Sequence, residues 1–268
     1  MKKCVLWILV AVFFCAVTYG GCGGGGSDLT SVYPDDDPVP ENNGGGEDSS
    51  GTTVDLYKLT RDYIAQSGDT LTGRLYRDDL SIHIADGATV TLKDVAIENG
   101  SYGSLRYGIY CQGNATIILE GSNTVKGTSF QASRRSGIYI PEGYTLTIRG
   151  SGSLTAQGDG GSTTGIGAGV TYSKSGGGAL TGTDCGNIVI DGGTVNAIGG
   201  GLAPGIGSPN GTHGNITITK NVSRVEVTAG EYGKYSIGSL NYPETSGTIT
   251  IGGVVTGPIT DNPFVYEP

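Results

Sequence analysis

Short stretches in which apolar and polar residues alternate fill the sequence after residue 66. One such stretch recurs at residues 89–92, 116–119, 145–148, 187–190, 215–218 and 248–251, and successive first apolar positions are 27, 29, 42, 28 and 33 residues apart. A period of two is typical of β-strands, and no helix-length apolar periodicity follows Tyr19. The pattern predicts an all-β fold built from repeats.

Two further short elements accompany each repeat. One precedes it, at residues 82–84, 108–110, 137–139, 165–167, 205–207 and 236–238, and another follows it, at 95–97, 124–125, 154–156, 195–197 and 225–227. Three short strands cannot form a core alone, but stacked coils pair each strand in parallel with its equivalent about 4.8 Å away. We predict a right-handed parallel β-helix of about six coils over residues 54–268. A β-sandwich is less favoured because two-residue hairpin signals are mostly absent.

The longest repeat and the two ends carry additional predictions. The 42-residue spacing indicates an insertion at residues 168–184, which we expect to leave one corner as a loop. A stack of coils must cover its terminal apolar cores and strand edges. We expect residues 54–60 to lie across the first coil and residues 258–268, with Phe264 and Tyr266, to close the last one.

The first 53 residues differ in composition from the rest. Residues 1–21 are predicted to be a signal peptide, with Lys2 and Lys3 ahead of an apolar core that is too short to span a bilayer. Cys22 follows two glycines, which resembles a lipobox and predicts lipidation and anchoring at the outer membrane or cell surface. Tyr19 replaces the usual Leu, so ordinary cleavage and secretion is the alternative. Residues 22–53 are Gly-, Pro- and Asp-rich and predict a disordered linker.

Charge and cysteine content narrow the function. Of the 25 acidic residues, seven lie in the linker, which leaves residues 54–268 with 18 acidic against 14 basic residues. No basic stripe is present, so nucleic acid is not an expected partner. Contact with a membrane is expected only through the lipid anchor on Cys22. Cys111 and Cys185 fall in different positions of the repeat, two coils apart, and are predicted to be free thiols.

Several runs also resemble a known family. The runs at residues 67–73 and 85–92, followed by the Gly-Ile-Gly and Gly-Asn-Ile-Val-Ile-Asp-Gly-Gly-Thr-Val repeats, resemble bacterial surface lipoproteins of the Bacteroidetes type, described as carbohydrate-binding-domain proteins with a pectate-lyase-like β-helix. The resemblance covers about residues 66–257. It implies exposure at the cell surface and a glycan-binding role, and it assigns no binding residues.

No catalytic constellation is recognisable, so we predict a protein that is not an enzyme. Asp78 and Asp79 lack the His and Arg motifs that accompany such pairs in polygalacturonase-type β-helices. Asp86 and Glu142 occupy equivalent turns two coils apart, about 9.6 Å by strand spacing, which favours ordinary turn acids over a glycosidase pair. A polysaccharide lyase or hydrolase is the less favoured alternative. No cofactor or metal site is predicted, and a requirement for Ca²⁺ stays open.

Tyrosine and arginine suggest a binding surface. Alternation points Tyr110 and Tyr139 outward, in one column with His83, and Arg106 and Arg135 stand four residues before the two tyrosines. Sugar rings stack on aromatic faces and Arg can bind hydroxyls or a carboxylate, so these five residues predict a site for glycan, including acidic polysaccharide.

The binding hypothesis includes further residues near the two tyrosines, and two alternatives to it stay open. The glycines that continue the column would leave a trough beside the rings, and Tyr102, Tyr107 and Tyr172 are further candidates for the site. The rival for the rings is a structural ladder, because aromatic neighbours on adjacent strands stabilise each other. The rival for the whole protein is a structural or adhesive β-helix that contacts another protein or a host surface.

Overall fold

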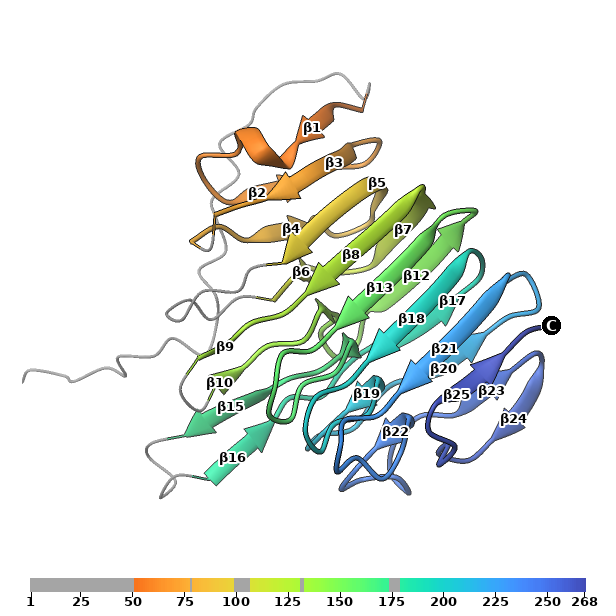
Figure 1. Cartoon of the computed structure of the whole chain (residues 1–268). Coiled ribbons are helices and arrows are strands. Elements are labelled where there is room, and N and C mark those ends of the chain that lie inside the picture. Colours follow the sequence, from red (N-terminus) through yellow and green to blue (C-terminus); the bar gives the residue numbers. More distant parts are fainter. Residues whose placement is uncertain (1–50, 78, 99–106, 131–132, 174–178) are drawn as a thin grey trace, which may run out of the picture. The chain divides into compact units, whose positions relative to one another are not determined.

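The computed structural model describes residues 51–77, 79–98, 107–130, 133–173 and 179–268. Within these residues, all regular structure is strand except a short 3-10 helix, η1 (Leu56–Lys58). The strands form two long sheets and one small sheet (Figure 1). The described part is therefore all-β, as the alternation of apolar and polar residues predicted.

The largest sheet, with 14 strands in the described chain, consists of two columns that meet at β5 (Ala88–Glu98). On one side, the first half of β5 pairs with β7 of the first column and its second half with β8 of the second column. On the other side, β3 pairs along both halves of β5. The first column is β1 (Thr53–Asp55), β3 (Thr70–Leu75), β5, β7 (Ala115–Glu120), β12 (Thr145–Gly150), β17 (Asn187–Ile190), β20 (Ile216–Ile218), β23 (Ile249–Ile251) and β24 (Val254–Thr256). The second column continues from β5 through β8 (Ser122–Lys126), β13 (Ser153–Gln157), β18 (Thr194–Ile198), β21 (Arg224–Thr228) and β25 (Phe264–Tyr266).

A seven-stranded sheet of described residues makes the third column. Its strands are β2 (Tyr63–Ala65), β4 (Ile82–Ile84), β6 (Ile109–Cys111), β11 (Ile138–Tyr139), β14 (Ile166–Gly167), β19 (Ile206–Ser208) and β22 (Ile237–Ser239), and all of them pair in parallel. The chain visits the third, first and second columns in this order, pass after pass. Equivalent segments of successive passes therefore become direct neighbours.

Aliphatic side chains line up from pass to pass. In the third column, one isoleucine of each strand from β4 to β22 pairs with the next, and each is almost fully buried: Ile82, Ile109, Ile138, Ile166, Ile206 and Ile237. The other two columns contribute similar rows, and all belong to one buried cluster. This continuous core stabilises strands that are individually too short to persist, because burying a Leu- or Ile-sized side chain contributes roughly 1.5–3 kcal/mol.

One register differs from the sequence alignment. The recurring motif predicted that Leu146 lies beside Ile117, but Leu146 pairs with Ala115, and Ile148 pairs with Ile117. The true offset between these two passes is 31 residues where the motif gave 29. Because side chains alternate between the two faces of a strand, a shift of two keeps every apolar residue facing the core, so the alternation cannot distinguish the two registers.

The sequence predicted a loop for the insertion at residues 168–184, but the structure shows an antiparallel hairpin there. Strands β15 (Val170–Ser173) and β16 (Ala179–Gly182) pair antiparallel, and β15 also pairs with β10 (Ser133–Arg134). Strand β10 in turn pairs with β9 (Ser129–Phe130), an element that the repeat pattern did not predict. Mutual pairing gives backbone groups of these four short strands hydrogen-bond partners, which buried or closely packed backbone requires.

The two ends are closed in different ways. At the first pass, β1 pairs in parallel with β3, and the side chain of Leu56 in η1 is buried in the core. At the last passes, β24 pairs antiparallel with β23, and β25 pairs antiparallel with β21. Phe264 and Tyr266 of β25 pack against the core, as expected for a covering tail.

Polar side chains at the corners connect one pass to the next. The Asp86 Oδ1 atom accepts a hydrogen bond from the Asn114 backbone N–H (2.8 Å), and the Asn114 Oδ1 atom accepts one from the Thr145 N–H (3.0 Å). Asn187 and Asn215 repeat the pattern two and three passes further on, with the Asn187 Oδ1 atom accepting from the Asn215 N–H at 2.8 Å. These side chains replace ladder bonds where the backbone turns between sheets.

Candidate functional site

The predicted outer column of rings exists in the expected register. His83 in β4 pairs with Tyr110 in β6, which pairs with Tyr139 in β11. The neighbouring isoleucines of these strands are fully buried, whereas Tyr110 and Tyr139 are partly exposed. We call His83, Tyr110 and Tyr139 the ring column.

A fourth ring packs into this column. Tyr107 stacks on Tyr139 with ring centroids 4.6 Å apart and an interplanar angle of 13°, and its centroid lies 5.6 Å from that of Tyr110. His83 and Tyr139 flank Tyr110, at centroid distances of 5.3 and 5.4 Å. Tyr107 is only 5% exposed, so its ring faces are occupied by protein. Tyr102 and the side chain of Tyr172 lie outside the described residues.

The charged and titratable partners of the column lie below the surface. Arg135 is 6% exposed; its Nη1 donates a hydrogen bond to the Tyr107 hydroxyl (2.9 Å), and its Cζ lies 4.8 Å from the Tyr107 ring centroid. His83 is 1% exposed. Arg106 lies outside the described residues. A buried guanidinium over a ring is a strong internal contact, and neither Arg135 nor His83 can reach a ligand without movement of their neighbours.

Tyr139 has neighbours at both ends of its side chain. Its ring is packed as above, and the Thr183 side chain, which follows the inserted hairpin and donates a hydrogen bond to the Gly169 carbonyl oxygen (3.3 Å), lies near the Tyr139 hydroxyl. Burial raises the pKa of the Tyr139 phenol above its ordinary value. Among the described members of the predicted set, only the outer parts of Tyr110 and Tyr139 therefore remain available to a ligand.

The trough expected beyond the rings is absent from the described surface. Gly167, Gly207 and Gly238 continue the column in register, but all three are buried. Their φ values are 131°, 127° and 141°, a region that only glycine adopts easily. A Cβ on Gly167 would lie 2.1 Å from the Gly207 carbonyl oxygen. Glycine is thus needed at these positions for its positive φ and for the close approach of neighbouring strands, and the three residues do not open a binding groove.

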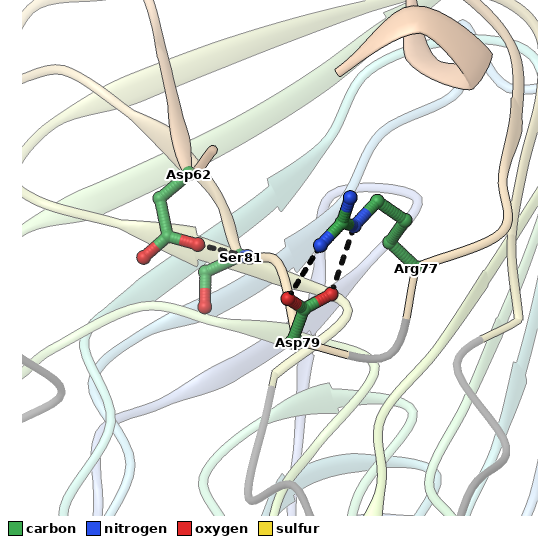
Figure 2. Close-up of polar contacts among 4 residues, drawn as sticks. All are labelled: Asp62, Arg77, Asp79 and Ser81. Carbon is green, nitrogen blue, oxygen red and sulfur yellow. Dashed lines mark hydrogen bonds and ion pairs between the residues drawn. The ribbon is translucent and has the colours of Figure 1, made fainter. Parts of the chain in front are cut away.

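Of the acidic residues considered for catalysis, Asp86 and Asp79 make internal contacts, and Glu142 lies exposed in a turn. Asp86 accepts the corner hydrogen bond described above. Asp79 forms a two-point pair with Arg77, at 3.0 Å to Nε and 2.8 Å to Nη2, next to the Asp62 carboxylate that accepts from the Ser81 N–H at 2.7 Å (Figure 2). Asp78 lies outside the described residues. Among the residues that are described, no group of three or more His, Cys, Asp or Glu side chains could hold a metal ion.

The environments of Cys111 and Cys185 do not favour a reactive thiol. Cys111 and Cys185 are buried and carry free thiols. Burial raises the pKa of each thiol to about 12, so the neutral form persists at physiological pH. A reactive cysteine needs a thiolate and access to solvent, which neither residue has.

The most open aromatic pair was missed by the sequence interpretation. Tyr57 in η1 and Tyr76 just after β3 are 66% and 62% exposed, and their ring centroids lie 5.4 Å apart at an interplanar angle of 85°. The Arg74 Cζ lies 5.0 Å from the Tyr76 ring centroid. The order Arg74-Leu75-Tyr76 could have placed Arg74 and Tyr76 on one outer face, but no sequence signal linked them to Tyr57. We call Tyr57 and Tyr76 the N-terminal tyrosine pair.

Comparisons with known proteins identify no relative: no family model, curated protein or solved structure matches this chain. In the part of the chain that is described, no helix has the length and apolar character needed to cross a membrane. The site must therefore be interpreted from its own geometry.

Proposed function

We propose that this chain is a non-catalytic glycan-binding protein, displayed on a bacterial cell surface by a lipid on Cys22. The proposal includes a right-handed parallel β-helix whose three faces are the three strand columns. Its support is the repeated order of the columns, the parallel pairing of equivalent strands and the matching rows of buried aliphatic residues. Such a scaffold holds outward side chains at fixed positions without requiring them for the core.

The observation that carries the binding proposal is the rigidity of two partly exposed phenols. Tyr110 and Tyr139 project from adjacent parallel strands, and contacts with the rings of Tyr107 and His83 hold them in place. An aromatic side chain that is already immobilised loses little entropy when a sugar ring stacks against it. The exposed portions of Tyr110 and Tyr139 are thus suited to contact a glycan at low entropic cost.

A polysaccharide panel tests the proposal. Wild-type protein and a Tyr110→Ala/Tyr139→Ala variant would be assayed on neutral and uronate-containing polysaccharides, with near-UV circular dichroism to verify folding. A Tyr242→Ala variant, at an exposed tyrosine of another pass, serves as the matched control. Loss of a wild-type signal only in the double variant supports the proposal, and no wild-type signal on any polysaccharide contradicts it.

A structural or adhesive role is the second candidate, and a specific observation favours it. Tyr107 and Arg135, both buried, pack against the ring column, and His83 within the column is itself only 1% exposed. Aromatic contacts between adjacent strands contribute about 0.2–1 kcal/mol each, which is reason enough for a tyrosine ladder. In this case the Tyr110→Ala/Tyr139→Ala variant would lose stability and no polysaccharide would bind. Polysaccharide cleavage, the least supported role, predicts new reducing ends or unsaturated uronates in the same panel.

A further inference from the structure

The N-terminal tyrosine pair presents more open aromatic surface than any member of the ring column. Both side chains are more than half exposed, and the edge-to-face arrangement with centroids 5.4 Å apart leaves ring surface of each uncovered by the other. A single exposed tyrosine is ordinary, but two exposed rings in contact form a continuous aromatic surface of the kind that binding sites use.

Local structure fixes where both rings point. In η1, the buried Leu56 anchors the turn in the core, and the Asp55 Oδ1 atom accepts a hydrogen bond from the Tyr57 N–H (3.2 Å). In β3, Leu75 is buried and its neighbours Arg74 and Tyr76 lie on the outer side. The backbone of Tyr57 is therefore set by the core and by a cap, and that of Tyr76 follows directly from a buried strand residue.

Ion pairs surround the rings. Arg74 Nη2 lies 3.1 Å from Glu98 Oε2, Lys58 Nζ lies 3.4 Å from Asp55 Oδ2, and Arg77 Nη2 lies 2.8 Å from Asp79 Oδ2 (the last pair is drawn in Figure 2). All six side chains are at least about one third exposed and all three cations have an acidic partner. The three named pairs cancel one another's charge, and Glu98 has a second cation, Lys126, 3.6 Å from its Oε1 atom. The patch therefore offers both hydrogen-bond donors and acceptors, with each of these cations beside an acid.

This combination selects among possible ligands. Pyranose rings have an apolar face that stacks on an aromatic ring and hydroxyls that both donate and accept, which matches tyrosines beside paired guanidinium and carboxylate groups. A uronate would meet an acidic side chain beside every cation. A protein partner would need about 800 Å² of its own surface, far more than two tyrosine rings provide.

We propose that the N-terminal tyrosine pair is a subsite for a neutral saccharide. A sugar ring stacks on Tyr57 or Tyr76, and the Arg74–Glu98 pair hydrogen-bonds its hydroxyls. The inference rests on the proposed glycan-binding function, but it assigns that function to a different surface and to uncharged ligands. The Arg74 Cζ lies 5.0 Å from the Tyr76 ring centroid, so the guanidinium covers part of that ring and stands beside the surface on which the sugar would stack.

Affinity electrophoresis of the full chain tests the inference. The gels contain β-glucan, xylan, mannan or galactan, and polygalacturonate and alginate serve as charged counterparts. The variants are Tyr57→Ala/Tyr76→Ala, Arg74→Gln and Tyr110→Ala/Tyr139→Ala, with Tyr232→Ala as a matched control because Tyr232 is 69% exposed. We expect about a tenfold or larger loss of affinity for one neutral polysaccharide in Tyr57→Ala/Tyr76→Ala, a smaller loss in Arg74→Gln and none in Tyr232→Ala.

The outcomes separate the two proposals. If wild-type protein binds none of the six polysaccharides, the proposed function and this inference both fail. If it binds one and only Tyr110→Ala/Tyr139→Ala weakens the binding, the proposed function stands and the inference is overturned. Binding confined to polygalacturonate or alginate, and weakened by added salt, would also overturn the inference, since a neutral ligand predicts little dependence on salt.

Discussion

The ring column and the N-terminal tyrosine pair use the same residue type in opposite ways. Beside the ring column, Tyr107 stacks on Tyr139 and accepts a hydrogen bond from the buried Arg135, so the protein itself covers one face of Tyr139 and the polar tip of Tyr107. In the N-terminal pair, Tyr57 and Tyr76 touch one another but remain mostly exposed. A tyrosine that faces outward from a strand is therefore not necessarily a surface tyrosine.

The difference follows from what the chain supplies at each position. Tyr107 lies just before β6, and Thr183 follows the inserted hairpin, so segments between the strands deliver covering groups to Tyr139. The N-terminal pair lies on the first pass, where η1 covers the core with Leu56 and leaves Tyr57 outside. Coverage by connecting segments, more than position in the strand, decides which tyrosines can meet a ligand.

Alkaline pH should give the largest effect, and it acts on the buried region. Burial raises the thiol pKa of Cys111 and Cys185 from an ordinary value of 9.0 to about 12, so the folded state keeps both thiols neutral after the unfolded chain has lost these protons. The resulting stability is complete below about pH 9 and is lost as the pH rises through the folded pKa. Urea denaturation between pH 8 and pH 12 should show this fall, and a Cys111→Ala/Cys185→Ala variant should show a shallower one. Equal slopes for both proteins would contradict the assignment.

The next largest effect is expected from truncating one tyrosine in each region, because the two variants should differ in their free energy of unfolding. Tyr107→Ala removes a buried ring stacked on Tyr139 and should lower the free energy of unfolding by about 3–5 kcal/mol. Tyr57→Ala removes an exposed ring and should change it by less than about 0.5 kcal/mol. Chemical denaturation of both variants provides the comparison. Similar values would mean that the two regions do not differ in packing as described.

The glycine continuation of the ring column offers a third test. A Cβ at Gly167 would lie 2.1 Å from a backbone oxygen, whereas one at Gly143, with φ of 85°, meets nothing within 4 Å. Both substitutions strain a left-handed backbone by roughly 1–2 kcal/mol, and Gly167→Ala should cost about 1–3 kcal/mol more through the clash. Thermal unfolding of the two variants measures the difference. If Gly143→Ala were the worse variant, the close approach of neighbouring passes would be disproved.

The smallest effect should come from removing a single hydroxyl. Tyr107→Phe keeps the stacked ring but removes the acceptor for Arg135 Nη1, which should cost about 1–3 kcal/mol because the guanidinium is buried. Tyr57→Phe should be neutral within about 0.5 kcal/mol. Urea midpoints of the two variants give the measurement, and a neutral Tyr107→Phe would show that this hydrogen bond adds no net stability.

Much of the architecture could be predicted from the chain, with specific exceptions. The alternation predicted the buried isoleucine row and the pairing of His83 with Tyr110 and of Tyr110 with Tyr139. It could not predict that Leu146 pairs with Ala115, because a shift of two residues preserves the inward face. The hairpin formed by β15 and β16 was also missed. It depends on the pairing of β15 with β10, and the repeat pattern contains no signal for that pairing.

For the candidate site, the sequence by itself determined which residues share a column, because strand periodicity and repeat spacing are local properties of the chain. Only the tertiary structure decided that Arg135 lies beneath Tyr107 and that Tyr57 meets Tyr76. Burial and ring contacts depend on which distant segments arrive at a position. The packing of the whole core decides which segments come together, and the sequence of a single repeat does not contain this information.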